Sequence, residues 1–146
     1  MRALIGISAA AAVFAGFILL RNTIIPSGIG AIDGKLAPPP GFLNAVSSQT
    51  EVARNRVEPL RFKSNLEETK GSILQALDKV DCIELQKVEG PYIHALSKNG
   101  VFGSSTDIEF YIDENAGVVH YRSAPRLYTF SKQTCRDRYE QIVALY

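Results

Sequence analysis

Polar and apolar residues alternate along four stretches in the second half of the chain. These stretches are residues 82–88, 92–98, 106–113 and 117–124. Turn-forming residues separate them, among them Gly90, the pair Asn99-Gly100 and Gly117. A period of two residues predicts strands, and the short connections predict that neighbouring strands run antiparallel.

Helical spacing appears on both sides of these strands. In residues 64–80 the apolar positions lie on one helical face, and Ser64 with Glu67 has the spacing of a capping box. Residues 131–146 carry a second apolar stripe. A short run at 56–62 indicates one more strand, in which Pro59 indicates an edge or an end. We therefore predict an α+β fold, with an antiparallel sheet of about five strands and two helices on one face.

The beginning of the chain is apolar throughout. Residues 3–20 contain no charge, and Arg2 and Arg21 flank them. As a helix the span would be roughly 27 Å long, close to the hydrocarbon thickness of a bilayer. We predict an uncleaved transmembrane anchor at residues 1–21, with a signal peptide cleaved after Ala15 as the alternative. The flanking charges favour a cytoplasmic N-terminus, which would put the rest of a single-pass protein in the periplasm.

The next segment, residues 22–56, is rich in proline and glycine. Its three consecutive prolines, 38–40, favour a stiff extended spacer. We predict that Ile24–Gly34 is a mobile tether. Leu36–Gln49 carries several apolar side chains, which predicts a strap laid across the folded domain. The α+β domain itself is predicted to span residues 57–146.

Charge adds one candidate site. The totals are nearly balanced, with 16 Lys+Arg against 15 Asp+Glu, which argues against nucleic acid as a partner. An acidic stretch at residues 107–114 is followed by a basic stretch at residues 122–138. The two interpretations are an anion-binding pocket and an internal ion-pair network between the strands and the last helix. The candidate binding residues are Asp107, Glu109, Ser123, Arg126, Arg136 and Arg138.

The remaining chemistry is sparse. Cys82 and Cys135 are the two cysteines, and they form either a disulfide or two unpaired thiols. Together with His94 and His120 their spacing matches no zinc motif, so we predict no metal and no cofactor. There is no G-x-S-x-G motif and no evident paired base. The sequence therefore predicts a protein that is not an enzyme.

Several motifs together resemble a known family. They are "DGKLAPPPGFLNAVSSQ", "VEPLRF", "YIHALSKNGVFGSSTDIEFYIDENAGVVHYRSAPR" and "RDRYEQI". They are similar to the domain of unknown function 1499 family over roughly Gly30 to Ile142. The resemblance implies an exported or membrane-anchored bacterial protein with relatives in thylakoids, and it implies no established activity. The family leader usually has two cysteines where this chain has Pro39 and Ala45.

Two functions of different classes follow from these observations. The first is a non-catalytic, membrane-anchored extracytoplasmic domain that serves as an accessory or interaction subunit. Its partners would be the lipid bilayer and a larger membrane complex, in the periplasm or alternatively in the thylakoid lumen. The second is a binding module for a small anionic or lipid-like ligand.

Overall fold

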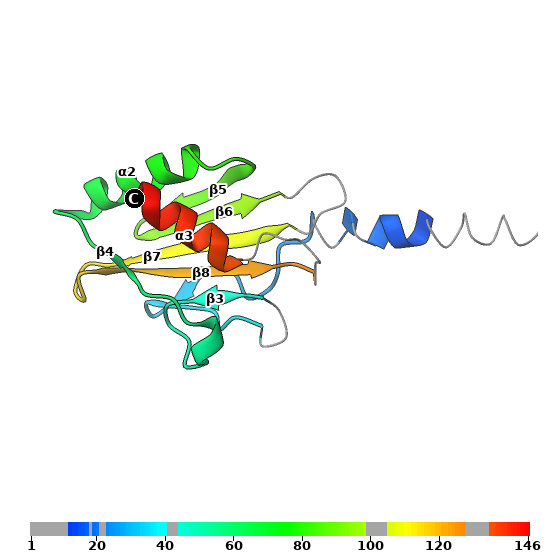
Figure 1. Ribbon diagram of the computed structural model, residues 1–146, viewed down its shortest axis with the longest axis horizontal. Helices are drawn as coiled ribbons and strands as arrows, with labels where there is room; N and C mark the ends of the chain where they lie inside the picture. Colours follow the sequence, from blue (N-terminus) through cyan, green and yellow to red (C-terminus); the bar gives the residue numbers. More distant parts are fainter. Residues whose placement is uncertain (1–11, 18, 21–22, 41–43, 99–104, 128–134) are drawn as a thin grey trace, which may run out of the picture.

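The central feature of the fold is a six-stranded antiparallel sheet (Figure 1). The structure is a computed structural model that describes residues 12–17, 19–20, 23–40, 44–98, 105–127 and 135–146. The strands are β3 (Val46–Ser47), β4 (Leu60–Arg61), β5 (Ile83–Glu89), β6 (Tyr92–Ser97), β7 (Thr106–Asp113) and β8 (Val118–Pro125). Their order is β3-β8-β7-β6-β5, and β4 also pairs with β8. The alternation in the sequence correctly predicted the four longer strands.

A smaller hairpin lies outside the main sheet. Strand β1 (Ala31–Ile32) pairs antiparallel with β2 (Lys35–Leu36), and Asp33 and Gly34 between them both have positive φ. A short 3-10 helix, η1 (Ala53–Asn55), follows β3. The segment predicted as tether and strap thus supplies three strands, and β3 pairs with β8 in the main sheet.

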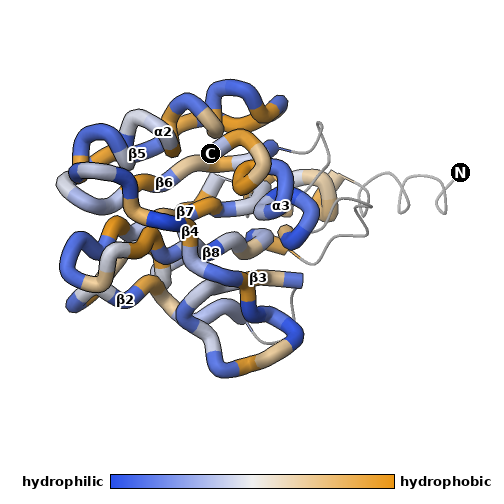
Figure 2. Tube along the Cα trace, turned by 60° about the vertical axis from the view of Figure 1, so that its left-hand side comes forward, coloured by the Kyte–Doolittle hydropathy of each residue, from blue (hydrophilic) through white to orange (hydrophobic). Residues whose placement is uncertain are grey.

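Both long helices pack on the same face of the main sheet. They are α2 (Leu66–Asp78) and α3 (Cys135–Leu145). Ile73 and Leu77 of α2 and Ile142 of α3 belong to one buried cluster with Ile108 and Phe110 of β7. Hydrophobic and hydrophilic residues alternate around the turns of α2 (Figure 2). The prediction of an α+β fold with two helices on one face of an antiparallel sheet is confirmed.

The strand register sorts side chains onto two faces. Ile108 of β7 is opposite Ala95 of β6 and Ser123 of β8, and this row faces the helices. Glu109, the next residue, is opposite His94 and Arg122. Because successive residues of a strand point to opposite faces, the charged row lies on the face away from the helices.

The prediction of a transmembrane helix, and with it the single-pass localisation, is corrected. Among the described residues no helix is long and apolar enough to cross a membrane. A spanning helix needs about 20 consecutive apolar residues. In the predicted span only residues 12–17 and 19–20 are described as helical, and residues 1–11 and 18 lie outside the described part.

Candidate functional site

The charged row on β7 is the strongest concentration of chemistry in the described structure. Asp107 and Glu109 are both buried, with exposed fractions of 2% and 0%. A buried carboxylate is unfavourable unless it is paired and hydrogen-bonded. The contacts of these two carboxylates therefore decide whether the row is a binding site or an internal network.

Glu109 has three partners from three parts of the chain. Its Oε2 forms an ion pair with Nη1 of Arg122 on β8. Its Oε1 accepts hydrogen bonds from the Tyr92 hydroxyl on β6 and from the Gly30 backbone N–H, each at 2.8 Å. This carboxylate is fully engaged inside the protein.

Asp107 is engaged in the same way. Arg126 donates through Nε to Oδ2 at 2.9 Å and through Nη2 to Oδ1 at 2.8 Å, which is a bidentate pair. His94 Nε2 lies 2.9 Å from Oδ1. Burial alone would raise the pKa of Asp107, but the hydrogen bonds and charges of Arg126 and His94 hold the pKa below its usual range.

The segment before β3 covers this charged layer. Besides the Gly30 contact, Gln49 fixes the β1–β2 hairpin through both ends of its side-chain amide. Its Nε2 donates to the Gly34 carbonyl and its Oε1 accepts from the Leu36 N–H, both at 2.9 Å. Leu36 is 5% exposed. The segment before β3 therefore covers the charged layer on the side from which an anion would enter.

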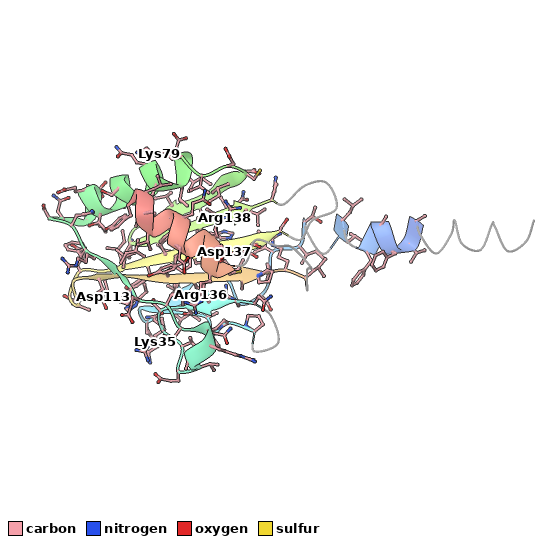
Figure 3. The ribbon with its side chains drawn as sticks, viewed as in Figure 1. Lys35, Lys79, Asp113, Arg136, Asp137 and Arg138 are labelled. Atoms are coloured by element: carbon pink, nitrogen blue, oxygen red, sulfur yellow. The ribbon has the colours of Figure 1, made fainter. Side chains whose placement is uncertain are left out.

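The structure separates the six predicted binding residues into four places. Asp107, Glu109 and Arg126 lie together in the charged layer. Ser123 is fully buried on the opposite face, towards the helices. Arg136 and Arg138 lie on different sides of α3 (Figure 3). The six residues do not line one pocket.

The two arginines of α3 contact backbone groups. Arg136 donates to the carbonyls of Arg54 and Arg56 at 3.1 and 2.9 Å, next to η1. Arg138 is buried and donates to the Asp81 carbonyl at 3.3 Å, beyond the end of α2. Both side chains thus connect α3 to neighbouring segments.

Four members of the network are not among the predicted binding residues. They are Gly30, Tyr92, His94 and Arg122. Arg122 could have been found from the hairpin register, because the turn at residues 114–117 sets it opposite Glu109. No local signal pairs Gly30 with a residue 79 positions later.

The two cysteines are free in the structure, so of the two alternatives the structure has the unpaired thiols. Cys82 is exposed and Cys135 is buried. Burial raises the pKa of the Cys135 thiol, which keeps it protonated and unreactive. In the described part of the chain, no group of three or more His, Cys, Asp or Glu residues could hold a metal ion.

The far edge of the sheet carries a different surface. A groove of about 440 Å³ lies between α2 and β5, lined by Leu74, Gln75, Leu77, Asp78, Ile83 and Leu85. Within the described residues β5 pairs with β6 alone, and six of its seven residues are exposed. Leu85 and Val88 are 49% and 41% exposed. Their partners in β6, Ala95 and Ile93, face the helices, so both apolar side chains lie on the same face as the groove.

In the part of the chain that the structure describes, the fold and its contacts define an α+β domain with a buried charged layer and an unpaired apolar edge at β5. The chain belongs to a family of proteins of unknown function (DUF1499), whose model matches residues 35–145. This match confirms the resemblance found in the sequence. The comparison with curated proteins found no match, and the comparison with solved structures found none either.

Proposed function

We propose that this chain is a non-catalytic protein-interaction domain that binds an extended strand of a protein along β5. The observation that carries the proposal is the open edge of β5 beside an apolar groove. An edge strand presents unpaired N–H and C=O groups that can pair with another strand. A groove next to such an edge can take side chains of the added strand, which gives specificity.

The apolar side chains of this edge support the proposal. Complete burial of a Leu or Val side chain is worth about 1.5–3 kcal/mol. Leu85 and Val88 are each close to half exposed on the groove side of β5. An added strand on this edge would remove much of that remaining surface from water.

The charged layer supports a non-catalytic role over the binding of a small anion. An anion would have to compete with Glu109 for Arg122 and with Asp107 for Arg126. It would also have to displace the segment that donates the Gly30 N–H to Glu109. The ion pairs of this layer connect β6, β7 and β8 to one another. The hydrogen bond from Gly30 connects the layer to the leader, which is the segment before β3.

Site-specific photocrosslinking tests the proposal. A benzophenone amino acid replaces Val88 in the full chain, in the cells that produce the protein. The control position is Val143 on α3, which is also a valine and is 42% exposed. We expect discrete crosslinked protein bands from position 88 and few or none from position 143. No band at either position, or the same bands at both, would contradict the proposal.

A further inference from the structure

We propose that the strand bound along β5 is β5 of a second copy of this chain, paired antiparallel about a two-fold axis between Leu85 and Gln86. This inference rests on the proposed function, because it names the partner at the same edge. In this register Ile83 is opposite Val88 of the second copy, Glu84 is opposite Lys87, and Leu85 is opposite Gln86.

An irregularity in β5 makes the outer pairs of this register geometrically consistent. Paired residues on antiparallel strands must share a face. In a regular strand Ile83 and Val88, five positions apart, would face opposite sides. The register of β5 with β6 shifts between Leu85 and Lys87, so Ile83 is opposite Ser97 while Val88 is opposite Ile93. Ser97 and Ile93 share a face of β6, and Ile83 and Val88 therefore share a face as well.

The same shift aligns the charges. Glu84 is opposite Leu96 and Lys87 is opposite His94, which places both charged residues on the face away from the groove. Across the two-fold axis each Glu84 then meets a Lys87 of the other copy, which gives two opposite-charge pairs. Opposite charges directly across a strand pair are favourable, and like charges are unfavourable.

Other registers are less favourable. An axis one residue further along the strand would set Glu84 opposite Glu89 of the second copy. An axis half a residue further would set Leu85 opposite Lys87. Charged residues and bulges on an edge strand usually prevent promiscuous pairing. Here they would select one register of one partner, because a register that sets like charges opposite each other is disfavoured.

The charged residues are also free to change partners. Glu84 forms an ion pair with Lys98, and Lys87 forms one with Glu89. All four side chains are more than half exposed, between 56% and 70%. Exposed pairs of this kind hold little energy because water screens them, so exchanging them for pairs between two copies carries little penalty.

Apolar side chains would also be buried between the two copies in this register. Ile83 lines the groove beside α2. The exposed Val88 of the second copy would lie next to it, on the same face. By symmetry this contact occurs twice, once at each end of the paired strands.

Charge reversal on the full chain tests the inference. Sedimentation at increasing concentration should show a species of twice the 16.0 kDa chain mass. We expect Glu84→Lys and Lys87→Glu each to raise the dimer dissociation constant about tenfold or more, because each change creates two like-charge pairs. The double variant should return the constant to within about threefold of the original, since both pairs become opposite again. Glu51→Lys is the control: Glu51 is exposed after β3, at the opposite edge of the sheet. It should leave the constant unchanged.

The outcomes separate this inference from the proposed function. A dimer that both single variants weaken and the double variant restores supports the inference. A dimer whose dissociation constant is the same in all these variants overturns it, because the two copies would then contact each other at another surface. A monomer at every concentration overturns it too, while discrete bands from position 88 that contain another protein would leave the proposed function standing. A monomer without bands overturns both.

Discussion

Glu109 of β7 lies directly opposite Arg122 of β8, and the two buried side chains form an ion pair with exposed fractions of 0% and 7%. The Tyr92 hydroxyl and the Gly30 N–H complete the coordination of the carboxylate. The Glu109 side chain thus joins three strands of the sheet, β6, β7 and β8, to the leader. It also makes the charged layer sensitive to the loss of any one partner.

We expect Arg122→Met to lower the free energy of unfolding by about 3–5 kcal/mol, because Glu109 would keep a buried charge without its counterion. Urea denaturation followed by circular dichroism measures the change. Arg136→Met is the matched control, since the hydrogen bonds of Arg136 to described residues go to carbonyls near the surface, and it should cost about 0.5–1.5 kcal/mol. Equal losses in the two variants would contradict a special role for the buried pair.

The double variant Glu109→Gln/Arg122→Met separates the buried charge from the lost packing. Removing the carboxylate charge as well should recover part of the stability lost in Arg122→Met. The glutamine can still accept a hydrogen bond from Tyr92 or Gly30. A double variant less stable than Arg122→Met would show that the charge on Glu109 is not what makes the single variant unstable.

Asp107 makes the stability of the folded domain depend on pH. Its pKa in the folded protein is lowered below the ordinary value of about 4, against the effect of burial. The ionised carboxylate therefore stabilises the fold above the unfolded-state pKa, and this stabilisation is lost as the pH falls through the lower, folded-state pKa.

Urea unfolding at pH values between about 6 and 2 measures this dependence. We expect the free energy of unfolding to decline on the acid side in the original chain. In Asp107→Asn the overall stability should be lower and the acid-side decline shallower, because that titrating group is gone. A decline of the same slope in both proteins would exclude Asp107 as a source of the pH dependence.

The first turn of α2 shows where a sequence motif was assigned one residue too early. Ser64 with Glu67 predicted the cap, whereas the structure has Asn65 as the N-cap residue, with φ −160° and ψ 171°. The Asn65 side chain accepts a hydrogen bond from the Glu68 N–H at 2.8 Å. Ser64 and Asn65 both have capping side chains, and each has a glutamate three residues later, so local sequence does not separate them.

We expect Asn65→Ala to lower the free energy of unfolding by about 1 kcal/mol, as for the loss of a helix cap. Ser64→Ala, the neighbouring substitution, should change it by less than about 0.5 kcal/mol. Thermal or urea unfolding of the two variants makes the comparison. A larger loss of stability in Ser64→Ala than in Asn65→Ala would contradict Asn65 as the N-cap residue and favour Ser64.

The sequence predicted local structure well where the pattern extends over several residues. Strands β5 to β8 and helices α2 and α3 carry periodic apolar positions that the core requires. Strand β3 has only two residues, too few for a period, and it forms because Val46 and Ser47 pair with β8. The alternation in β7 puts Ile108 and Glu109 on opposite faces, as a period of two residues requires. It could not show that the polar face is buried, because the segment covering it comes from a distant part of the chain.

The leader shows this limit most clearly. Ile24–Gly34 was predicted as a mobile tether, yet the Gly30 N–H binds Glu109 and Ala31–Ile32 forms strand β1. Glycine and proline predict freedom or stiffness of the backbone, but they carry no information on a partner far along the chain. The two hydrogen bonds of the Gln49 side chain likewise go to main-chain groups, those of Gly34 and Leu36. Sequence cannot single out these two residues, because other residue types have the same main-chain groups.

We expect Gln49→Ala to loosen the leader without disturbing the sheet. The variant loses both hydrogen bonds that fix the β1–β2 hairpin, so the Gly30 and Leu36 amides should exchange with deuterium about tenfold faster or more, while the core amide of Ile108 keeps its rate. Gln75→Ala, at an exposed glutamine on α2, is the control and should leave all three rates unchanged. Two results would contradict a leader held in place by Gln49. One is unchanged exchange at Gly30 and Leu36 in Gln49→Ala. The other is exchange at Gly30 in the original chain as fast as at the exposed Ser27.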